Sequence, residues 1–571
     1  ASSALASTTS CAGVENGAAI VILPATDAPY DMLRVRGTEL VRGDGQKVVL
    51  RGVAFGNQVY TGTPVPSLHH DEQDYARLAA MGMNSVRFYL AHQSFENDDE
   101  PGVYLDAGFA WLDQNVAWAK KHGIYLVLNM HVPFGGYQSL GAGRQLWNDP
   151  TAQNRFIALW QMIAARYAGE STIAGFDLLN EPVPTKSAAQ WHDLAERTIA
   201  GIRLFDAHHP LFVERVNAVA GNYREDDERN FFRVSDPNVV YEFHFYKPFD
   251  FTHQGAPWAE FTSPEARYPD DGVAEADWFL LESKGSFESA RLPSGNSDWK
   301  SYETPAVRVE DASWQIGKPV LACDSNAGTA SFDDLVLERL DDDGKSWKPL
   351  WSRNLNTKRG WYFWTQNGHG RVRVHPSGHG DSAALSIEKT TSPANLGADP
   401  LRFVPEIGRS YRLRGFMRGE NVSVDARCAL RLEFFSSSVP VHTRGRAYLK
   451  QELDAYLSWG RRQEVPLYLG EFGTIRSSYE GDRGGLRWTS DMLDLLLEAD
   501  VGFAYHAYHE DYFAFFYGNG ALSDTRNANT PLLELFTEKL RAHAAGEATP
   551  STDDATPSSG EAAPSSDALT P

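Results

Sequence analysis

Short apolar runs alternate with amphipathic segments along two parts of the chain. The runs are almost continuously hydrophobic, as in strands buried on both faces, and the segments between them have helical periodicity. Eight such runs are present: KVVLRGVAF (47–55), NSVRFYL (84–90), IYLVLNMH (124–131), IAGFDLLNEP (173–182), LFVERV (211–216), NVVYEFHFY (238–246), PLYLGEFG (466–473) and VGFAYHAY (501–508). Strands and helices in this alternation predict an α/β fold, a (β/α)8 TIM barrel.

The helical segments carry their own boundary signals. Asp71 precedes a helix predicted over 71–82, where it serves as the cap, and Pro150 opens a helix that ends at Gly169. The same periodicity predicts helices over 109–123, 188–206, 446–463, 488–500 and 531–544.

Residues 283–440 break this alternation. Apolar residues recur there with period two between glycine-rich turns, which is typical of an antiparallel sandwich. We therefore expect an all-β domain inserted between strands six and seven. The predicted organisation is an N-terminal extension (1–32), the first part of the barrel (33–268), the insert with its connectors (269–440), the second part of the barrel (441–545) and a linker (546–571).

The two ends of the chain differ in composition from the rest. The tail GEATPSTDDATPSSGEAAPSSDALTP contains five acidic residues and no Lys or Arg, so it predicts a disordered linker. The opening ASSALASTTSCAG is rich in small residues, as expected either of a mature N-terminus after export or of an artificial start. Both ends favour a secreted, extracellular protein.

Charge and cysteine content narrow the possible partners. The formal net charge of −22 disfavours binding to nucleic acid and to anionic membranes, and we expect a monomer. Cys11, Cys323 and Cys428 show no CxxC spacing. Cys323 and Cys428 both fall in the insert, where they either form a disulfide, if their strands are neighbours, or stay reduced.

Polar residues stand where the predicted strands end. In a (β/α)8 barrel these ends form one face, so side chains from different strands converge there. Taken singly, an arginine or histidine at such a position more often stabilises the core. The candidates are Arg87, His131, Asn180, Glu181, His244, Tyr246, Glu471, His506 and Tyr508. Glu181 and Glu471 lie on strands four and seven, across the barrel mouth, and paired carboxyl groups are what glycosidic bond hydrolysis requires.

The motifs LRGVAFG, VRFYL, LVLNMH, LLNEP, HFY and LYLGEFG, in this order, resemble glycoside hydrolase family 5 over residues 33–268 and 441–545. The resemblance implies that Glu181 is the acid/base and Glu471 the nucleophile of a retaining enzyme. It also implies that Asn180 contacts the sugar 2-hydroxyl, that Arg87 and Tyr246 bond Glu471, and that His131 and His244 line the site of the sugar bearing the cleaved bond.

One position departs from the family pattern. The family usually has a Trp platform on strand eight, and this chain has His506 near that place. The floor under the sugar is therefore expected from Tyr508, or from Tyr512, Phe513 or other aromatics in the following loop.

We interpret the chain as a retaining β-glycosidase that acts on a β-glucan, cellulose-like or β-1,3-linked, or a related polysaccharide, without metal or cofactor. Three alternatives stay open: a transglycosylase, a β-mannan hydrolase, and a non-catalytic glycan-binding protein on the same frame. The sequence His69-His70-Asp71 has the composition of a metal site, but Asp71 is better explained as a helix cap.

The insert resembles the jelly-roll carbohydrate-binding modules found beside polysaccharide hydrolases. Residues 328–340 are similar to the closing strand of such modules and precede segments similar to the opening strands (360–370 and 378–387), which implies a circular permutation. Residues 341–344, DDDG, are an acidic turn or, less simply, a calcium site. The sugar platforms would come from four tryptophans, of which we expect two or more in the core: Trp299, Trp351, Trp361 and Trp364.

Overall fold

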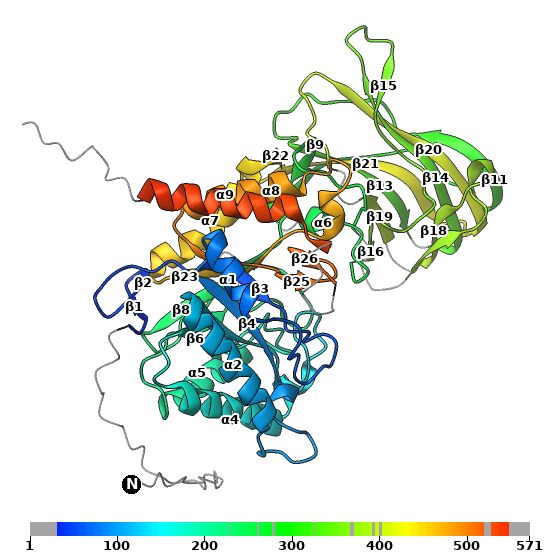
Figure 1. Cartoon of the computed structure of the whole chain (residues 1–571). Coiled ribbons are helices and arrows are strands. Elements are labelled where there is room, and N and C mark those ends of the chain that lie inside the picture. The colour runs from blue at the N-terminus through cyan, green and yellow to red at the C-terminus, as the bar shows by residue number, and fades with distance from the viewer. Residues whose placement is uncertain are drawn as a thin grey trace, which may run out of the picture.

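The computed structural model (Figure 1) describes residues 31–547, except for 227, 260–261, 277–279, 325, 366–369, 391–393, 399–401 and 519–526. The predicted extension (1–32) and linker (546–571) therefore lie almost wholly outside the described residues. Within the described part of the chain, no helix has the length and apolar character needed to cross a membrane.

A closed parallel barrel forms the larger part of the molecule, as predicted. Its strands are hydrogen-bonded in chain order, and β24 pairs with β3 to close the cylinder. Six strands precede the insert and two follow it: β3 (Arg51–Phe55), β4 (Ser85–Ala91), β5 (Tyr125–Val132), β6 (Ile173–Asp177), β7 (Leu211–Glu214), β8 (Val239–Phe245), β23 (Leu467–Phe472) and β24 (Gly502–Tyr505).

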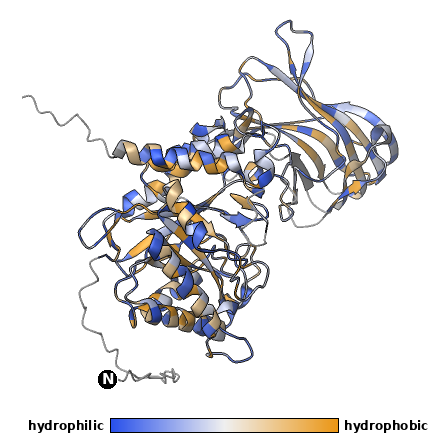
Figure 2. Cartoon of the chain, viewed as in Figure 1, coloured by the Kyte–Doolittle hydropathy of each residue, from blue (hydrophilic) through white to orange (hydrophobic). Residues whose placement is uncertain are grey.

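Helices cover the outside of the barrel and bury their apolar faces against it. Asp71 caps α1 as predicted: its side chain accepts from the Gln73 backbone N–H, and Asp74 closes the capping box. Figure 2 shows hydrophobic and hydrophilic residues on the same helices, as expected of elements with one buried face. The helices are α1 (Glu72–Met81), α2 (Asp106–His122), α3 (Arg144–Asn148), α4 (Pro150–Tyr167), α5 (Ala189–Arg203), α6 (Phe249–Thr252), α7 (Arg446–Gln463), α8 (Gly485–Glu498) and α9 (Thr530–Glu547).

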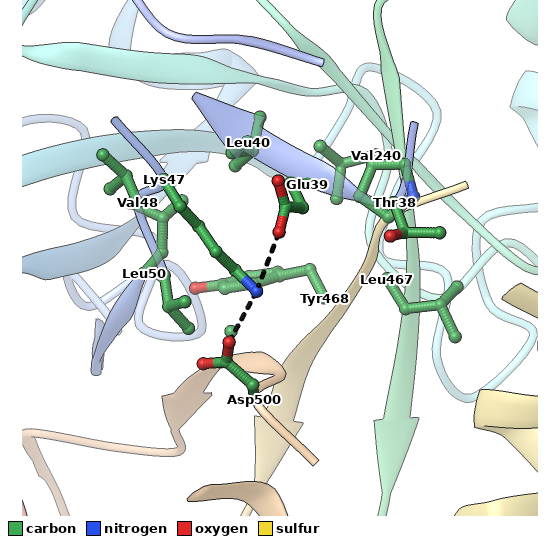
Figure 3. Close-up of a pocket in the computed structure, with 13 residues that line it drawn as sticks. Thr38, Glu39, Leu40, Lys47, Val48, Leu50, Val240, Leu467, Tyr468 and Asp500 are labelled. Atoms are coloured by element: carbon green, nitrogen blue, oxygen red, sulfur yellow. Dashed lines mark hydrogen bonds and ion pairs between the residues drawn. The ribbon is translucent and has the colours of Figure 1, made fainter. Parts of the chain in front are cut away.

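A hairpin, β1 (Arg34–Arg36) and β2 (Glu39–Val41), lies at the amino-terminal end of the barrel. A small pocket beside it is lined by residues at the starts of strands (Figure 3). Lys47 crosses this pocket and forms ion pairs with Glu39 at 3.3 Å and Asp500 at 2.5 Å. Because substrates of such barrels bind at the opposite end, we interpret this pocket as structural.

The insert is a two-sheet, antiparallel β domain. It stands beside the barrel, on the side of α6 and α8 (Figure 1), and is joined to it by the paired strands β9 (Asp270–Glu275) and β22 (His442–Arg444). One sheet has the order β10 (Leu281–Glu288), β21 (Arg427–Ser437), β13 (Ile316–Asp324), β19 (Ala394–Ala398), β16 (Trp361–Thr365). The other has the order β11 (Gly295–Glu303), β20 (Ser410–Val422), β14 (Asn326–Leu340), β18 (Ala384–Thr390), β17 (Arg371–His375), with β12 (Val307–Arg308) and β15 (Trp347–Arg353) attached.

The structure decides three features of the insert for which the sequence left alternatives: the cysteine pair, the tryptophans and the acidic turn. Cys323 and Cys428 face each other on β13 and β21 and form a disulfide. Trp361 is buried and Trp351 packs against the same core, whereas Trp364 is 45% exposed. In the 341–344 turn, Lys348 neutralises Asp341 at 2.7 Å, and Asp343 accepts hydrogen bonds from the Lys345 and Ser346 backbone, which agrees with an acidic turn.

Candidate active site

Glu471, at the carboxyl end of β23, is held by three donors. Arg87 Nη1 donates to its Oε1 at 2.8 Å, Tyr89 O–H donates to the same oxygen at 2.5 Å, and Tyr246 O–H donates to Oε2 at 2.9 Å. Arg87 also donates from Nη2 to Asn180 Oδ1 at 3.1 Å. The contacts from Arg87 and Tyr246 to Glu471 are those the family resemblance implied, and Tyr89 is a partner that the sequence-based prediction missed.

Glu181 follows β6 in a left-handed backbone conformation, with φ of 43°. A side chain with a β-carbon is strained there unless its surroundings hold it, and such positions cluster at functional sites. The Glu181 backbone N–H donates to Glu214 Oε2 at 2.6 Å, and this buried acceptor stabilises the turn. The turn aims the Glu181 carboxylate at His244, whose Nδ1 lies 2.9 Å from Oε1.

His244 connects the two glutamates. Its Nδ1 is 2.9 Å from Glu181 and 3.5 Å from Glu471 Oε2. One oxygen of each carboxylate and one nitrogen of His244 all lie within 4.8 Å of one another. The barrel therefore places two carboxyl groups, from strands four and seven, side by side with one imidazole.

The pKa values of Glu471 and His244 are shifted in opposite directions by their neighbours. Burial acts to raise the pKa of Glu471, but the basic side chains around it, chiefly those of His244, His506 and Arg87, outweigh burial and hold the pKa well below its usual range. Burial acts to lower the pKa of His244, but Glu214 and Glu471 raise it well above the ordinary value. At neutral pH Glu471 is thus ionised and His244 carries a proton.

Three further carboxyl groups lie beneath this pair, inside the barrel. Arg87 Nε is 2.9 Å from Asp177 Oδ2 and 3.0 Å from Glu242 Oε1, and all three side chains are fully buried. Glu214 and Glu242 each approach His244 Nε2 to 3.6 Å.

Arg87 and His244 cannot balance five carboxylates, so some of these acids hold a proton. Burial, assisted by Glu242, raises the pKa of Asp177 well above its usual value. Burial raises the pKa of Glu214 to about 8, and His244 opposes this shift. Because Asp177 and Glu214 hold protons, they do not compete for the positive charges of Arg87 and His244, which then stabilise the Glu471 carboxylate.

The remaining predicted residues fall on either side of Tyr89. His131 stacks on the Tyr89 ring at 3.8 Å, and its Nε2 lies 2.5 Å from the hydroxyl of Tyr60. Burial lowers the pKa of His131 well below the ordinary value, so the ring is neutral. His506 Nδ1 lies 3.0 Å from the Tyr89 hydroxyl, so His506 belongs to the same cluster.

Tyr508 requires a correction, because it does not join this cluster. The regular part of β24 ends at Tyr505, so strand alternation no longer orients the residues that follow. The Tyr508 hydroxyl donates to Asp74 Oδ1 at 2.9 Å and accepts from Arg77 Nη1, behind the barrel mouth. Of the loop aromatics named as its alternatives, Phe513 is buried 5.7 Å from the His506 ring, and Tyr512 is 40% exposed.

Exposed aromatic side chains flank the glutamates. On the Glu181 side, Tyr223 is 51% exposed and donates to the backbone carbonyl of Ser139 at 2.7 Å. On the Glu471 side, Trp258 is 43% exposed and meets Tyr512 edge to face at 4.9 Å. Sugar rings pack their apolar faces on such side chains, so Tyr223 and Trp258 are candidate sugar contacts on the two sides of the carboxyl pair.

Two groups of possible metal ligands fall within this site, Glu181–His244–Glu471 and Glu214–Glu242–His244. Both depend on His244. A histidine must be deprotonated at the coordinating nitrogen to bind a metal, and the acidic side chains around His244 hold its pKa well above the ordinary value. We therefore interpret both groups as clusters of charged and polar side chains around His244, with a hydrogen bond between His244 Nδ1 and Glu181.

Comparison with known proteins agrees with this geometry for the first part of the barrel. Residues 41–285 match the family model described as Cellulase (glycosyl hydrolase family 5). The matched range includes Arg87, Glu181 and His244 and ends before Glu471.

Curated relatives match over similar lengths. Endoglucanase C of Acetivibrio thermocellus is 36% identical over 191 residues, which are 33% of this chain and 54% of that protein. A beta-xylosidase of Phanerodontia chrysosporium is 29% identical over 294 residues, 44% of this chain and 59% of that protein. The chain spans about half the length of the curated relatives it matches. Among solved structures, Thermotoga maritima Cel5A in complex with cellobiose is 17% identical with a TM-score of 0.45, covering 86% of this chain and 97% of that chain.

Proposed function

We propose that the chain is a retaining glycoside hydrolase that cleaves β-glycosidic bonds of a β-glucan, with Glu471 as nucleophile and Glu181 as acid/base. The observation that carries the proposal is the pairing of these carboxylates, whose nearest oxygens lie within 4.8 Å of each other. Carboxyl groups of retaining enzymes stand about 5–5.5 Å apart and those of inverting enzymes roughly 6.5–9.5 Å apart, to admit a water. The close pairing supports retention.

The reaction takes place in two steps. The ionised Glu471 attacks the anomeric carbon while Glu181 gives its proton to the departing glycosidic oxygen, and a covalent glycosyl–enzyme ester forms. Glu181 then takes a proton from water, which displaces Glu471 from the sugar with net retention of configuration. Each carboxyl returns to its starting state, because the proton that Glu181 gives to the leaving group is replaced by the one it takes from water.

The side chains around the two glutamates orient the nucleophile and contact the sugar. Arg87, Tyr89 and Tyr246 keep the Glu471 carboxylate oriented and charged before attack. Asn180, bonded to Arg87 and to Ser139, is positioned beside the acid/base, where its side chain suits a hydrogen bond to a sugar hydroxyl. His131, stacked on the Tyr89 ring, and His506, 3.0 Å from the Tyr89 hydroxyl, are the polar neighbours that we assign to the sugar.

The substrate class rests on the relatives. An endoglucanase and a beta-xylosidase are among them, which supports a β-linked polysaccharide or oligosaccharide of glucose or a similar sugar. A transglycosylase shares the first half-reaction, a β-mannan hydrolase shares the whole mechanism, and a glycan-binding protein shares only the contacts with the sugar. Product analysis on defined oligosaccharides separates these alternatives.

The decisive experiment uses Glu181→Gln and Glu471→Gln with a soluble β-glucan and an aryl β-glucoside. Each variant should lose nearly all turnover and keep the fold, because only the reacting group changes. Azide should rescue Glu181→Ala with retained configuration and Glu471→Gly with inverted configuration. Near-full activity in either Gln variant would refute the assignment.

We also propose that the insert, a carbohydrate-binding-module-like domain, contributes to binding of long chains, and that the protein is exported. The insert follows β8, whose carboxyl end lies on the catalytic face, and it exposes Trp364. The Cys323–Cys428 disulfide suits an oxidising compartment. Replacing residues 283–440 by a short Gly/Ser linker should reduce hydrolysis of polysaccharide but not of aryl glycosides; equal loss on both would indicate a structural role, and no loss would refute the proposal.

A further inference from the structure

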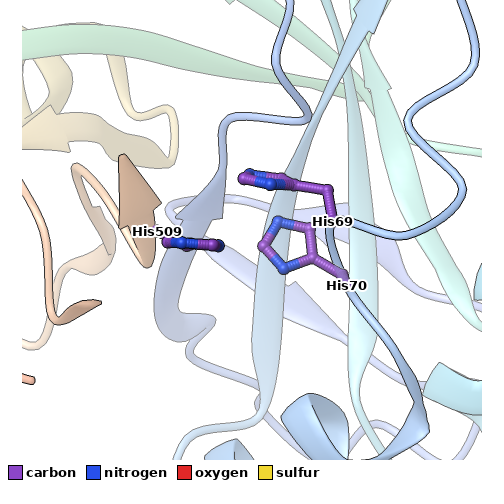
Figure 4. Close-up of side chains that lie close together, drawn as sticks. All are labelled: His69, His70 and His509. Atoms are coloured by element: carbon purple, nitrogen blue, oxygen red, sulfur yellow. The ribbon is translucent and has the colours of Figure 1, made fainter. Parts of the chain in front are cut away.

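A second cluster of ionisable side chains lies outside the proposed catalytic pair. His69 and His70 lie just before α1, and His509 begins β25 (His509–Glu510), which pairs with β26 (Phe516–Tyr517) (Figure 4). All three histidines are buried, with 3%, 6% and 4% of their surface exposed. One ring nitrogen from each lies within 4.8 Å of the other two. Segments from opposite ends of the barrel sequence thus meet through three imidazoles.

This cluster carries polar atoms without partners. Both ring nitrogens of His70 and Nδ1 of His509 are buried and make no hydrogen bond. The surroundings offer little compensation, because Phe55 stacks on His70 with ring centroids 3.9 Å apart. Buried nitrogens in such a setting are destabilising unless a ligand satisfies them.

Burial disfavours protonation of two of the three rings. Burial lowers the pKa of His70, against the opposing effect of Asp74. Burial and then His70 lower the pKa of His509 to about 4. Neutral imidazole is the form that binds metals.

A buried carboxylate stands behind the cluster. Asp74 Oδ2 lies 3.8 Å from His70 Nδ1, and the same carboxyl group meets Arg77 at 2.8 Å and the Tyr508 hydroxyl at 2.9 Å. Asp71 also faces His70 and is engaged as the cap of α1. A carboxylate next to a histidine is the usual outer partner of a metal-bound imidazole, since it fixes the ring and increases its basicity.

The ring orientations require one side-chain movement before the three nitrogens can share an ion. The His69 and His509 rings lie parallel, 10° apart with centroids separated by 4.4 Å, and His70 stands at 60° to His69. Because the lone pairs lie in the ring planes, two parallel rings cannot point at one ion. A shared ion therefore requires His509, on the short ribbon β25–β26, to rotate about its side-chain bonds.

We propose that His69, His70 and His509 bind one Zn²⁺ ion, which fastens the segment before α1 to β25. Three imidazoles form a nitrogen ligand set that zinc accepts, with a water completing a tetrahedral site. The role we assign to the ion is structural: it holds together two loops at the carboxyl-terminal face, next to the segment that carries His506. It takes no part in the glycosidase chemistry, and the proposal stands independently of that function.

The test is equilibrium binding of Zn²⁺ to the full chain, measured by elemental analysis after gel filtration and by titration calorimetry, with Co²⁺ absorption spectra to report the ligand geometry. The variants are His70→Ala and His509→Ala. The matched control is His192→Ala, a 46% exposed histidine side chain on α5.

We expect one ion per wild-type chain, a Co²⁺ spectrum typical of a four-coordinate nitrogen site, and a higher melting temperature with Zn²⁺. Both cluster variants should bind more than about 100-fold more weakly, because changes in outer-shell partners alone cost 10–100-fold. The control should bind as wild type. No stoichiometric binding to wild type would overturn the proposal.

Binding that survives in His509→Ala but is lost in Glu471→Gln would place the metal in the catalytic cleft and would also overturn it. If the cluster variants do not fold, wild-type crystals soaked in Zn²⁺ decide the matter by anomalous scattering at the zinc edge. Density among the three rings supports the site, and density elsewhere or none refutes it.

Discussion

Glutamine in place of Glu214 tests whether the acids beneath the Glu181–Glu471 pair are held protonated. Burial raises the pKa of Glu214 to about 8, from its ordinary value of 4.5. Between these pH values the folded chain keeps a proton that the unfolded chain releases, so the free energy of unfolding falls as pH rises. The slope is about 1.36 kcal/mol per pH unit, which makes roughly 2–3 kcal/mol between pH 5 and pH 7.

In the wild type the Glu181 N–H donates to Glu214 Oε2 at 2.6 Å. Glutamine keeps an oxygen that can accept this hydrogen bond, but its side chain cannot ionise. The stability of Glu214→Gln relative to wild type should therefore increase by roughly 2–3 kcal/mol from pH 5 to pH 7, and turnover at pH 6 should change little. Urea unfolding followed by tryptophan fluorescence measures this difference at each pH.

Glu225→Gln is the matched control, because Glu225 is a mostly buried glutamate shifted in the opposite direction. Burial raises its pKa, but Lys247 and Arg215 outweigh burial and lower it, so its contribution is present above the unfolded pKa and is lost only in acid. Its variant should be destabilised by a constant amount from pH 5 to pH 7. A constant difference between Glu214→Gln and wild type over the same range would refute a protonated Glu214.

Three other changes probe separate parts of the account. Tyr246→Phe removes a donor to the Glu471 carboxylate, and kcat should fall about 10–100-fold, as expected for a charge-assisted hydrogen bond; an unchanged kcat on aryl glycosides would contradict this. Trp258→Ala should raise KM for long oligosaccharides several-fold and leave aryl glycosides unaffected, and an equal effect on both would argue against a sugar platform. Exchanging both cysteines for serine (Cys323→Ser with Cys428→Ser) should destabilise the insert by about 2–4 kcal/mol in thermal melts, and reduced wild type should match the variant.

The barrel could be predicted from the sequence because its strands are buried on both faces and read as continuous apolar runs. The positions of Glu181 and Glu471 followed, since a strand that ends in a carboxyl group delivers it to the barrel mouth. Tyr89 and Glu242 were missed although a signal existed. They lie two residues from Arg87 and His244 on β4 and β8, and residues two apart on a strand point to the same side.

Other features could not be predicted because they depend on loops. Tyr508 is one of the side chains expected at the sugar floor because the apolar run predicts a strand over 501–508, whereas β24 ends at Tyr505. The contact of His509 with His69 joins segments far apart in sequence, and no local pattern encodes it. The partner of Glu214, the backbone N–H of Glu181, is visible only once the left-handed turn after β6 is known.

The central claim, that Glu471 attacks the sugar with Glu181 as its acid/base, is tested most directly by trapping the covalent intermediate. A 2-deoxy-2-fluoro β-cellobioside with a good leaving group slows breakdown of the glycosyl ester, so it should inactivate the enzyme in a time-dependent manner. Peptide mass spectrometry should then locate one sugar on Glu471, and Glu471→Gln should stay unlabelled. Turnover of an activated substrate without any covalent adduct, or an adduct on another residue, would contradict the account.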